Sequence, residues 1–320
     1  MNKPTAILTL LALLSSPTLA QRCQWATVRY TTDLVLENLV NPDLSPVSPF
    51  PISSPTTATN GGLNNNRQDE EWIRILAVSP SRPLYAYTQN LHPIAPDSQD
   101  SILSVPIREV LWTHSVVDQE VCAGAIRMLV TTGWGTNGTG EEDKAYLLSA
   151  QVRFNASLPA PPVVESLDVV VVGEGDWGMS AEGFVEELKE KVGREVWSAI
   201  SYVQQETRER LVDVANAYLD FYYGGGQNGE GSEKGEIWGK PCSRLDGLVY
   251  TSVGEGDETA DCAVVRTGGV TDRQVLVDES VGAVSVFGKD GSLGGAPGAW
   301  LFRVVEGRVR YIHHVSATVG

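Results

Sequence analysis

The sequence predicts an α+β fold made of two similar units, each a helix followed by a curved antiparallel sheet. Short apolar runs separated by turn-forming residues occupy much of the chain, and 32 Gly and 17 Pro residues supply the turns. Two stretches near the middle place apolar residues at helical spacing. Residues 116–125 (VVDQEVCAGA) also resemble residues 275–284 (VLVDESVGAV), which indicates an internal duplication unless the short match is a coincidence.

Length and charge limit the class of protein further. A chain of 320 residues is long enough for two domains, and 42% hydrophobic against 20% charged residues provides material for packed cores. The net charge of −16 argues against binding to nucleic acid, whose phosphates require clustered Lys and Arg. The same negative charge argues against binding to an anionic membrane surface. We therefore expect no nucleic-acid or membrane partner.

The first 20 residues have the pattern of a secretory signal peptide. Lys3 precedes an apolar run over residues 6–14, and a small-residue cleavage pattern ends at Ala20. A membrane anchor is the alternative, but the run is shorter than the roughly 20 residues that a spanning helix needs. We therefore expect a mature chain that begins near Gln21 and is secreted or resides in the lumen of the secretory pathway.

Cysteines and glycosylation sequons fit the same compartment. Asn137 and Asn155 each begin an Asn-X-Ser/Thr sequon, so both are candidate glycosylation sites. The chain has four cysteines, Cys23, Cys122, Cys242 and Cys262. An even number in an oxidising compartment predicts two disulfide bonds, and the count alone leaves three connectivities open.

The first unit is expected over residues 21–172. Apolar residues at helical spacing predict a helix over residues 24–40. A stretch rich in Pro, Ser, Thr and Asn follows over residues 42–70 and is interpreted as a surface insertion. Beyond it, short apolar runs such as residues 125–130 and 147–154 predict strands.

A helical linker over residues 173–197 is expected to join this unit to a second unit over residues 198–320. Apolar residues on one face predict helices over residues 181–196 and 198–223, and Gly224 ends the second helix. The second helix is expected to close the mouth of the sheet that follows. Strands of that sheet are predicted at residues 248–251, 262–266, 274–278, 282–287, 300–305 and 308–317.

Familiar cofactor and nucleophile motifs are absent or misplaced. Residues 173–178 (GEGDWG) match a dinucleotide-binding pattern, but two carboxylates would face the pyrophosphate and no second parallel strand follows. A Gly-rich turn between the units is the better interpretation. No GxSxG motif occurs, and the adjacent His313 and His314 point to opposite faces of a strand, so they cannot bind one ion together. We therefore expect neither a cofactor nor a metal.

Polar residues on the predicted strands form the candidate site. A carboxylate in an apolar cavity has a raised pKa and can remove a carbon-bound proton, while a nearby Tyr or Arg stabilises the resulting enolate. The alternative is that Asp118 and Asp278 are turn or edge-strand residues that pair with Arg. The candidates are His114 and Asp118 in the first unit and Tyr250, Asp278, Arg303 and His313 in the second.

Residues 238–247 (WGKPCSRLDG), 273–284 and 302–313 resemble motifs of an uncharacterised family of secreted fungal proteins. The stretch from His114 to Cys122 resembles the N-terminal half of the same family. The resemblance implies two tandem SnoaL-like domains, in which a cone-shaped antiparallel sheet packs with helices as in nuclear-transport-factor-like proteins. Ketosteroid isomerases, polyketide cyclases and the dimerising cyclases of maleic-anhydride-derived natural products share this cone. Residues 298–302 (GAWLF) depart from the family pattern, because a histidine expected there is absent.

A cofactor-free isomerase or cyclase of secondary metabolism, acting on a small apolar or polyketide-like ligand, is the function that the resemblance implies. Asp278 is then the expected base, with Tyr250, Arg303 and His313 orienting the substrate or stabilising an oxyanion. Strand alternation places Arg303 beside Leu301 and Val305, and His313 beside Tyr311 and Val315. His114 and Asp118, four residues apart and thus on one strand face, are the next candidate pair.

The alternative function is a non-catalytic secreted protein that binds a small ligand or acts as an effector. A polar, buried cluster would favour the enzyme, and a filled apolar interior would favour the alternative.

Both functions share one expectation about the cysteines. Because each pairing stays within one unit, we expect bonds between Cys23 and Cys122 and between Cys242 and Cys262.

Overall fold

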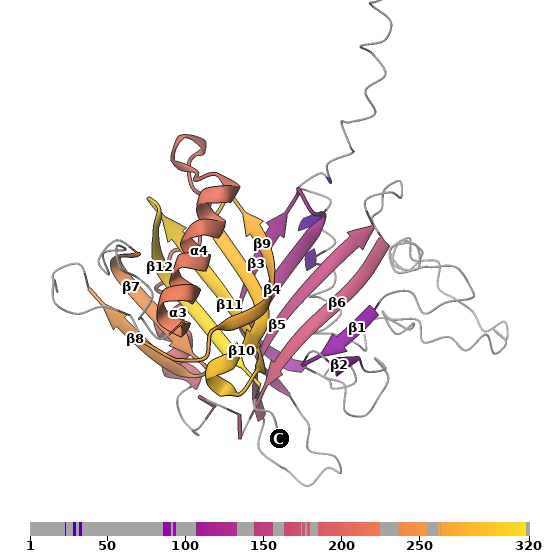
Figure 1. Ribbon diagram of the computed structural model, residues 1–320. Coiled ribbons are helices and arrows are strands. Elements are labelled where there is room, and N and C mark those ends of the chain that lie inside the picture. The colour runs from indigo at the N-terminus through magenta and orange to yellow at the C-terminus, as the bar shows by residue number, and fades with distance from the viewer. Residues whose placement is uncertain are drawn as a thin grey trace, which may run out of the picture.

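Two six-stranded sheets make up most of the computed structural model of the chain (Figure 1). The predicted signal peptide and the insertion at 42–70 lie outside the residues that the structure describes, as does most of the predicted helix 24–40. The described residues are 23, 28–29, 32–33, 86–90, 92–93, 107–132, 144–155, 163–173, 175–176, 178–179, 185–224, 237–254, 262 and 264–317.

The first sheet, sheet A, has the strand order β2-β1-β6-β5-β4-β3. Neighbouring strands are antiparallel except β1 and β6, which are parallel. Its strands are β1 (Ala86–Gln89), β2 (His92–Pro93), β3 (Ile107–Asp118), β4 (Ala123–Thr132), β5 (Lys144–Asn155) and β6 (Val163–Val172).

The second sheet, sheet B, repeats this arrangement with the order β8-β7-β12-β11-β10-β9, and β7 and β12 are its parallel pair. The tight turns after Asp118 and Asp278 are equivalent, because Asp118 pairs with Ala123 and Asp278 with Ala283. The two similar sequence stretches therefore occupy matching positions. The strands are β7 (Trp238–Asp246), β8 (Val249–Val253), β9 (Val270–Asp278), β10 (Ala283–Asp290), β11 (Ala296–Val305) and β12 (Arg308–Ser316).

The two sheets pack against each other through one face each. A shared apolar core joins Leu129 and Leu147 of sheet A to Phe287 and Val315 of sheet B. The inner strands of sheet B are covered on both faces, so β10 and β11 are apolar almost throughout rather than alternating. The outer face of sheet A carries a separate core, against which Val28 packs.

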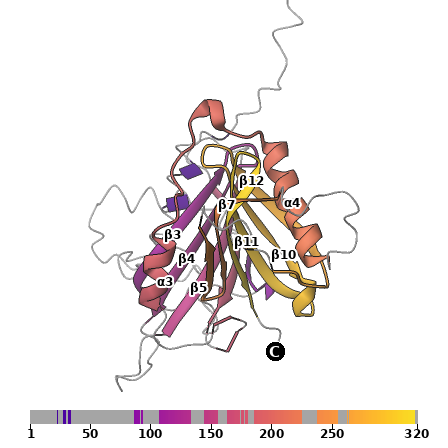
Figure 2. The same cartoon turned by 90° about the vertical axis from the view of Figure 1, so that its left-hand side faces the viewer.

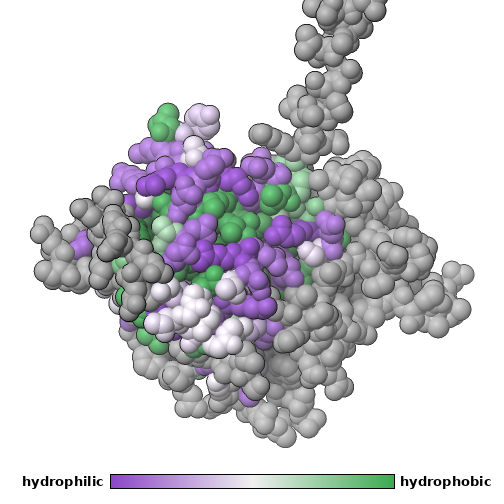
Figure 3. Space-filling model, viewed as in Figure 1, coloured by the Kyte–Doolittle hydropathy of each residue, from purple (hydrophilic) through white to green (hydrophobic). Residues whose placement is uncertain are grey.

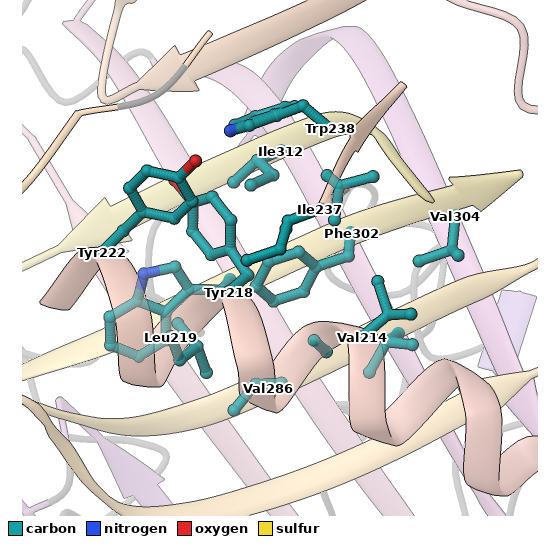
Figure 4. Packing of buried hydrophobic residues seen from close by; sticks show 14 of the residues in the cluster. Val214, Tyr218, Leu219, Tyr222, Ile237, Trp238, Val286, Phe302, Val304 and Ile312 are labelled. Carbon is teal, nitrogen blue, oxygen red and sulfur yellow. The ribbon is translucent and has the colours of Figure 1, made fainter. Parts of the chain in front are cut away.

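The long helix α4 (Arg208–Tyr223) crosses the outer face of sheet B (Figures 1 and 2). Its aromatic side chains lie over the strands beside Phe302 and Ile312, which fills the space beneath the helix (Figure 4). On the molecular surface seen from the same side as Figure 1, hydrophilic residues predominate, with hydrophobic residues between them (Figure 3). α4 is therefore an amphipathic cover for one face of sheet B and does not close the mouth of a cone, which was the role expected for it.

The helices are shorter than the sequence predicted. α3 (Val185–Val192) ends four residues before the predicted boundary of 196, and the segment after it is extended. α4 begins at Arg208 rather than 198 because the side chain of Thr207 caps it, accepting a hydrogen bond from the backbone N–H of Arg210. It ends at Gly224 as predicted. Two short 3₁₀ helices, η3 (Tyr202–Gln204) and η4 (Gly291–Leu293), are also present, and the described residues 28–29 and 32–33 are helical, as predicted for residues 24–40.

The predicted fold class is wrong. The described chain is mostly β, and it is not two cone-shaped sheets that each pack with helices. α4 covers one face of sheet B, helical Val28 packs on the outer face of sheet A, and the other large contact of the described residues is between the sheets themselves. Apolar alternation predicts that one face of a strand is buried, but it does not say whether a helix or a second sheet buries it.

Other features of the sequence can be compared with the structure directly. Both predicted disulfides are present, Cys23–Cys122 and Cys242–Cys262. No strand forms over residues 264–266, part of a predicted strand. The GEGDWG stretch contains a closed turn, in which the Asp176 carboxylate accepts a hydrogen bond from the Gly173 N–H at 2.9 Å. None of the described helices is long and apolar enough to cross a membrane.

Asp118 and Asp278 join the two sheets by a reciprocal pair of hydrogen bonds. The Asp118 carboxylate accepts from the Val277 N–H at 2.8 Å, and the Asp278 carboxylate accepts from the Val117 N–H at 3.0 Å. Both carboxylates are buried, and Asp118 also pairs with Arg208 at 2.7 Å. The two aspartates are thus turn residues, with an Arg partner at Asp118, which agrees with the alternative considered for them.

Asp118→Asn is expected to lower the free energy of unfolding by about 1–2 kcal/mol, because one charged acceptor becomes an N–H₂ group that faces other donors. Asp278→Asn should cost a similar amount, since its position is equivalent. Urea denaturation at neutral pH measures both. Asp213→Asn, at an exposed position of α4, is the matched control, and a loss as large as that of the buried variants would contradict the argument.

Candidate acid–base site

Two histidines and a glutamate meet between the sheets. His114 comes from β3, His313 from β12 and Glu195 from the extended segment after α3. One ligand atom of each side chain lies within 4.8 Å of the others. The closest contact joins His313 Nε2 to Glu195 Oε2 at 2.7 Å, and these two side chains are 0% and 1% exposed. The cluster is therefore a group of polar side chains within the contact between the sheets.

Strand alternation brings the histidines to this face. His114 shares a side of β3 with Trp112 and Asp118, and His313 shares a side of β12 with Tyr311 and Val315. The alternation predicted for His313 therefore agrees with the structure.

Three hydrogen bonds join the segment from Glu195 to Ile200 to sheet B. The Val196 N–H donates to the Tyr311 hydroxyl at 3.4 Å, Arg303 donates to the Ser198 carbonyl at 2.9 Å, and the Ile200 N–H donates to the Ser280 carbonyl at 2.8 Å. These bonds hold Glu195 against β12.

Glu195 is held in its ionised form by its neighbours. Burial alone would raise the pKa of Glu195, but the charge and hydrogen bond of His313 and the hydrogen bonds from Ser243 and Trp197 bring it below its usual value. The Trp197 indole N–H donates at 2.9 Å, and the Ser243 hydroxyl donates to the other carboxylate oxygen. Glu195 is therefore a fixed negative charge next to His313.

His114 is a neutral imidazole without a hydrogen bond on Nε2. Its ring stacks on the Trp197 ring at 4.5 Å between centroids, and Nε2 is buried without a partner among the described residues. Burial, together with the nearby charges of His313 and Arg127, lowers the pKa of His114 to about 3, although Glu195 acts in the opposite direction. His114 thus faces the dyad as an uncharged donor or acceptor.

Tyr250 and three half-buried aromatic residues complete the cluster. Burial, followed by the charge of Glu195, raises the pKa of Tyr250 to about 12, so its hydroxyl stays protonated. This hydroxyl lies within hydrogen-bonding reach of Ser243 and Glu195. Trp112, Trp197 and Tyr311 are each partly exposed, and the two tryptophans contact both histidine rings. The cluster therefore combines proton-transfer groups with flat apolar surfaces.

The two histidines and Glu195 are of the types that bind transition metals, but their spacing favours a shared proton. Ligands of a tetrahedral zinc ion, each about 2.0–2.2 Å from the metal, lie roughly 3.3 Å apart. His313 Nε2 and Glu195 Oε2 are closer than that, at hydrogen-bonding distance. The geometry is that of a histidine–carboxylate dyad.

A second polar cluster lies on the other face of sheet B, under α4. Asp246 accepts from Arg244 Nη2 at 2.9 Å and contacts His314 Nδ1 at 3.2 Å, while His314 Nε2 lies 3.3 Å from Asp290. The Tyr223 hydroxyl accepts from the Trp300 indole at 2.9 Å and contacts His314. Side chains of the α4 core contact this cluster, so we interpret it as a structural network.

The structure divides the six predicted site residues into two groups. His114, His313 and Tyr250 surround Glu195, whereas Asp278 lies on β9, three strands from β12 and thus about 14 Å from it. Asp278 therefore cannot share a proton with His313, and the role of base expected for it is not compatible with this geometry. Asp118 lies on the same strand as His114, but four residues and thus roughly 13 Å further along β3, where its carboxylate binds the Val277 N–H and Arg208.

Arg303 lies at the edge of the cluster rather than in it. Its Nη2 donates to the Ser198 carbonyl, and burial lowers its pKa although Tyr311 and Asp278 act in the opposite direction.

Of the predicted glycosylation sites, Asn155 is the last residue of β5, and Asn137 lies outside the described residues.

Glu195 and Trp197 were missed because the sequence places them at the end of a predicted helix that in fact stops at Val192. Arg127 was missed because it interrupts an apolar strand, where a charged residue usually points to solvent. A charged residue inside an apolar run was therefore the one feature of the sequence that could have indicated Arg127. For Ser243, the sequence offered no indication except its position next to Cys242.

Comparison with known proteins adds a partial match. A family model described as a domain of unknown function (DUF8021) matches residues 204–316, which contain α4 and all of sheet B. The match includes His313 and Tyr250 but neither Glu195 nor His114. No curated protein matches the chain.

Proposed function

We propose that this protein is an acid–base enzyme, an isomerase or cyclase acting on a small, largely apolar polyketide-like or maleic-anhydride-type molecule in an oxidising compartment. The two disulfides are consistent with a secreted or lumenal protein. The observation that carries the chemistry is the buried bond between Glu195 and His313. Proton transfer of this kind proceeds through the side chains alone.

The dyad fixes which nitrogen of His313 can accept a proton. Because the ionised Glu195 accepts a hydrogen bond from Nε2, the proton of the neutral ring resides on Nε2. Nδ1 then carries a lone pair, and it is buried without a hydrogen-bond partner among the described residues. An imidazole oriented by a carboxylate is a common general base, since the carboxylate stabilises the imidazolium that forms.

The neighbouring groups supply the remaining parts of a proton-transfer reaction. His313 Nδ1 would remove a proton from a carbon next to a carbonyl, and the same proton would return at another carbon, which leaves no net change in composition. The protonated hydroxyl of Tyr250 is suited to donate to the enolate oxygen. Trp112 and Trp197 offer flat surfaces for the apolar part of the substrate.

A carbon-acid probe tests the dyad without knowledge of the substrate. In a Kemp elimination, 5-nitrobenzisoxazole loses one carbon-bound proton to a base, and its product is followed by absorbance. We expect the wild-type protein to accelerate this reaction and His313→Gln to lose about 100-fold in rate. Glu195→Gln should also be slower, whereas Glu165→Gln, at an exposed position of β6, should match the wild type.

Equal rates for His313→Gln and the wild type, or no acceleration by the wild type, would exclude the dyad as a proton acceptor. The non-catalytic ligand-binding function would then be favoured, because the complete burial of His313 would reflect a structural role.

A further inference from the structure

Arg127 is a buried cation without an anionic partner. It lies in the middle of β4 with its side chain in the contact between the sheets, and the residue is 1% exposed. Nη2 donates to the Ala299 carbonyl at 2.9 Å, but Nε and Nη1 have no hydrogen-bond partner among the described residues. Burial lowers the pKa of Arg127 to about 9. A guanidinium left in this state opposes folding, so its presence requires another explanation.

Arg127 lies directly beside the candidate acid–base site. It is the cross-strand partner of His114, so the two side chains share a face of sheet A with Cβ atoms about 5 Å apart. The ring of His114 is 5.4 Å from that of His313. Arg127, His114 and His313 therefore form a row, and each has at least one buried nitrogen without a partner in the described part of the chain.

We propose that Arg127 and His114 bind the carboxylate, or the enolate oxygen formed from it, of a small aromatic or apolar ligand. Nε–H and Nη1–H lie on different edges of the guanidinium, so a carboxylate oxygen would accept from one of them, and the second N–H of Nη2 or His114 Nε2 would supply a further donor. Trp112 and Trp197, which flank His114, would contact the apolar part of the ligand. The role of this subsite in stabilising an oxyanion rests on the proposed function, but the binding of the anion does not.

The overall charge of the protein makes such an anchor selective. A chain with a net charge of −16 repels anions in general, so a carboxylate is retained only where a cation is specifically placed for it. Arg303 and Arg310 are also largely buried. Arg310 pairs with Glu306 at 3.6 Å, and Arg303 resembles Arg127 in having one carbonyl partner and unpartnered Nε and Nη1 atoms among the described residues. Arg127 is the one of these three that is the cross-strand partner of His114.

Benzoate and benzamide form a matched pair of probes for this subsite. They have the same ring and nearly the same shape, but only benzoate is charged. Binding of each is measured by quenching of tryptophan fluorescence, with isothermal titration calorimetry as a second method. For the wild type we expect benzoate to bind more tightly than benzamide.

Arg127→Met should weaken benzoate binding at least tenfold and leave benzamide binding unchanged. Arg127→Lys keeps the charge but loses the planar set of N–H donors, so its benzoate affinity should lie between those of the wild type and Arg127→Met. Arg308→Met removes an exposed positive charge from β12 and should change neither affinity. Arg127→Met is expected to melt no lower than the wild type, because a buried unpaired charge is replaced by an apolar side chain of similar length.

Equal benzoate affinity in the wild type and Arg127→Met, or no preference of the wild type for benzoate over benzamide, would overturn the proposal. A melting temperature of Arg127→Met well below that of the wild type would also overturn it, since the arginine would then be a structural requirement. His313→Gln separates this inference from the proposed function. If benzoate binding needs Arg127 while His313→Gln leaves the Kemp rate unchanged, the subsite stands and the catalytic proposal fails.

Discussion

Asp246→Ala is expected to lower the free energy of unfolding by about 3–5 kcal/mol, because it leaves the buried guanidinium of Arg244 without its carboxylate. Arg244 is 1% exposed and donates to Asp246 through both Nε and Nη2. His314 also contacts Asp246. The substitution therefore removes the common partner of two buried basic groups.

Electrostatics explains why this carboxylate has a large effect. Burial raises the pKa of Asp246, but the hydrogen bonds and charges of His314 and Arg244 bring it far below its usual value. A carboxyl group with a lowered pKa stabilises the folded state above its unfolded pKa, and this contribution is lost as the pH falls through the folded value. The full effect of Asp246→Ala should therefore be present at neutral pH.

Urea denaturation under non-reducing conditions measures the loss, and two variants make the result specific. Asp213→Ala removes an exposed aspartate of α4, so it should change stability by no more than about 0.5 kcal/mol. Removal of both buried charges by Arg244→Met together with Asp246→Leu should recover part of the loss. A cost below about 1 kcal/mol for Asp246→Ala would show that the network is not a structural requirement.

The sequence was sufficient to predict local features whose cause is local. Gly224 ends α4 because glycine follows the last apolar position of the helical stripe, and the Asp118 and Asp278 turns were found as one repeated pattern. The side of β12 that carries His313 followed from strand alternation alone. These properties depend on residues within about five positions of one another.

The partner of each strand face could not be predicted in this way. His313, Tyr250 and Arg303 were expected inside a cavity closed by a helix, but α4 covers the opposite face, and sheet A lies against the side that carries them. Contact between sheets depends on residues such as Arg127 and Ala299, 172 positions apart. Glu195 reaches the site only because α3 stops at Val192 and an extended segment follows.

The stability of the protein is expected to fall by about 3 kcal/mol between about pH 7.5 and pH 4.5, mainly through His114. The pKa of His114 is lowered from 6.5 to about 3, chiefly by burial, with further electrostatic effects of His313 and Arg127 that outweigh the opposite effect of Glu195. The unfolded chain therefore binds a proton below about pH 6.5 that the folded chain does not accept. Because the unfolded state takes up more protons in this range, the folded state loses stability as the pH falls.

The buried carboxyl groups with lowered pKa values titrate in a different part of the pH scale from His114. Glu195, Asp246 and Asp290 have lowered pKa values, so their contributions are lost only below the range of free carboxyl groups, about pH 4. His114→Gln should remove most of the pH dependence between pH 6.5 and 4.5. His92→Gln, which removes a histidine of β2, should retain it.

Urea midpoints at four pH values across this range, for the wild type and both variants, measure the slope directly. If His114→Gln keeps the wild-type slope, His114 accepts its proton in the folded state, which would require an anion or water beside Nε2. The same measurement in saturating benzoate then links this result to the subsite at Arg127. A carboxylate bound next to His114 favours its protonated form, so benzoate should flatten the slope in the wild type and leave it unchanged in Arg127→Met.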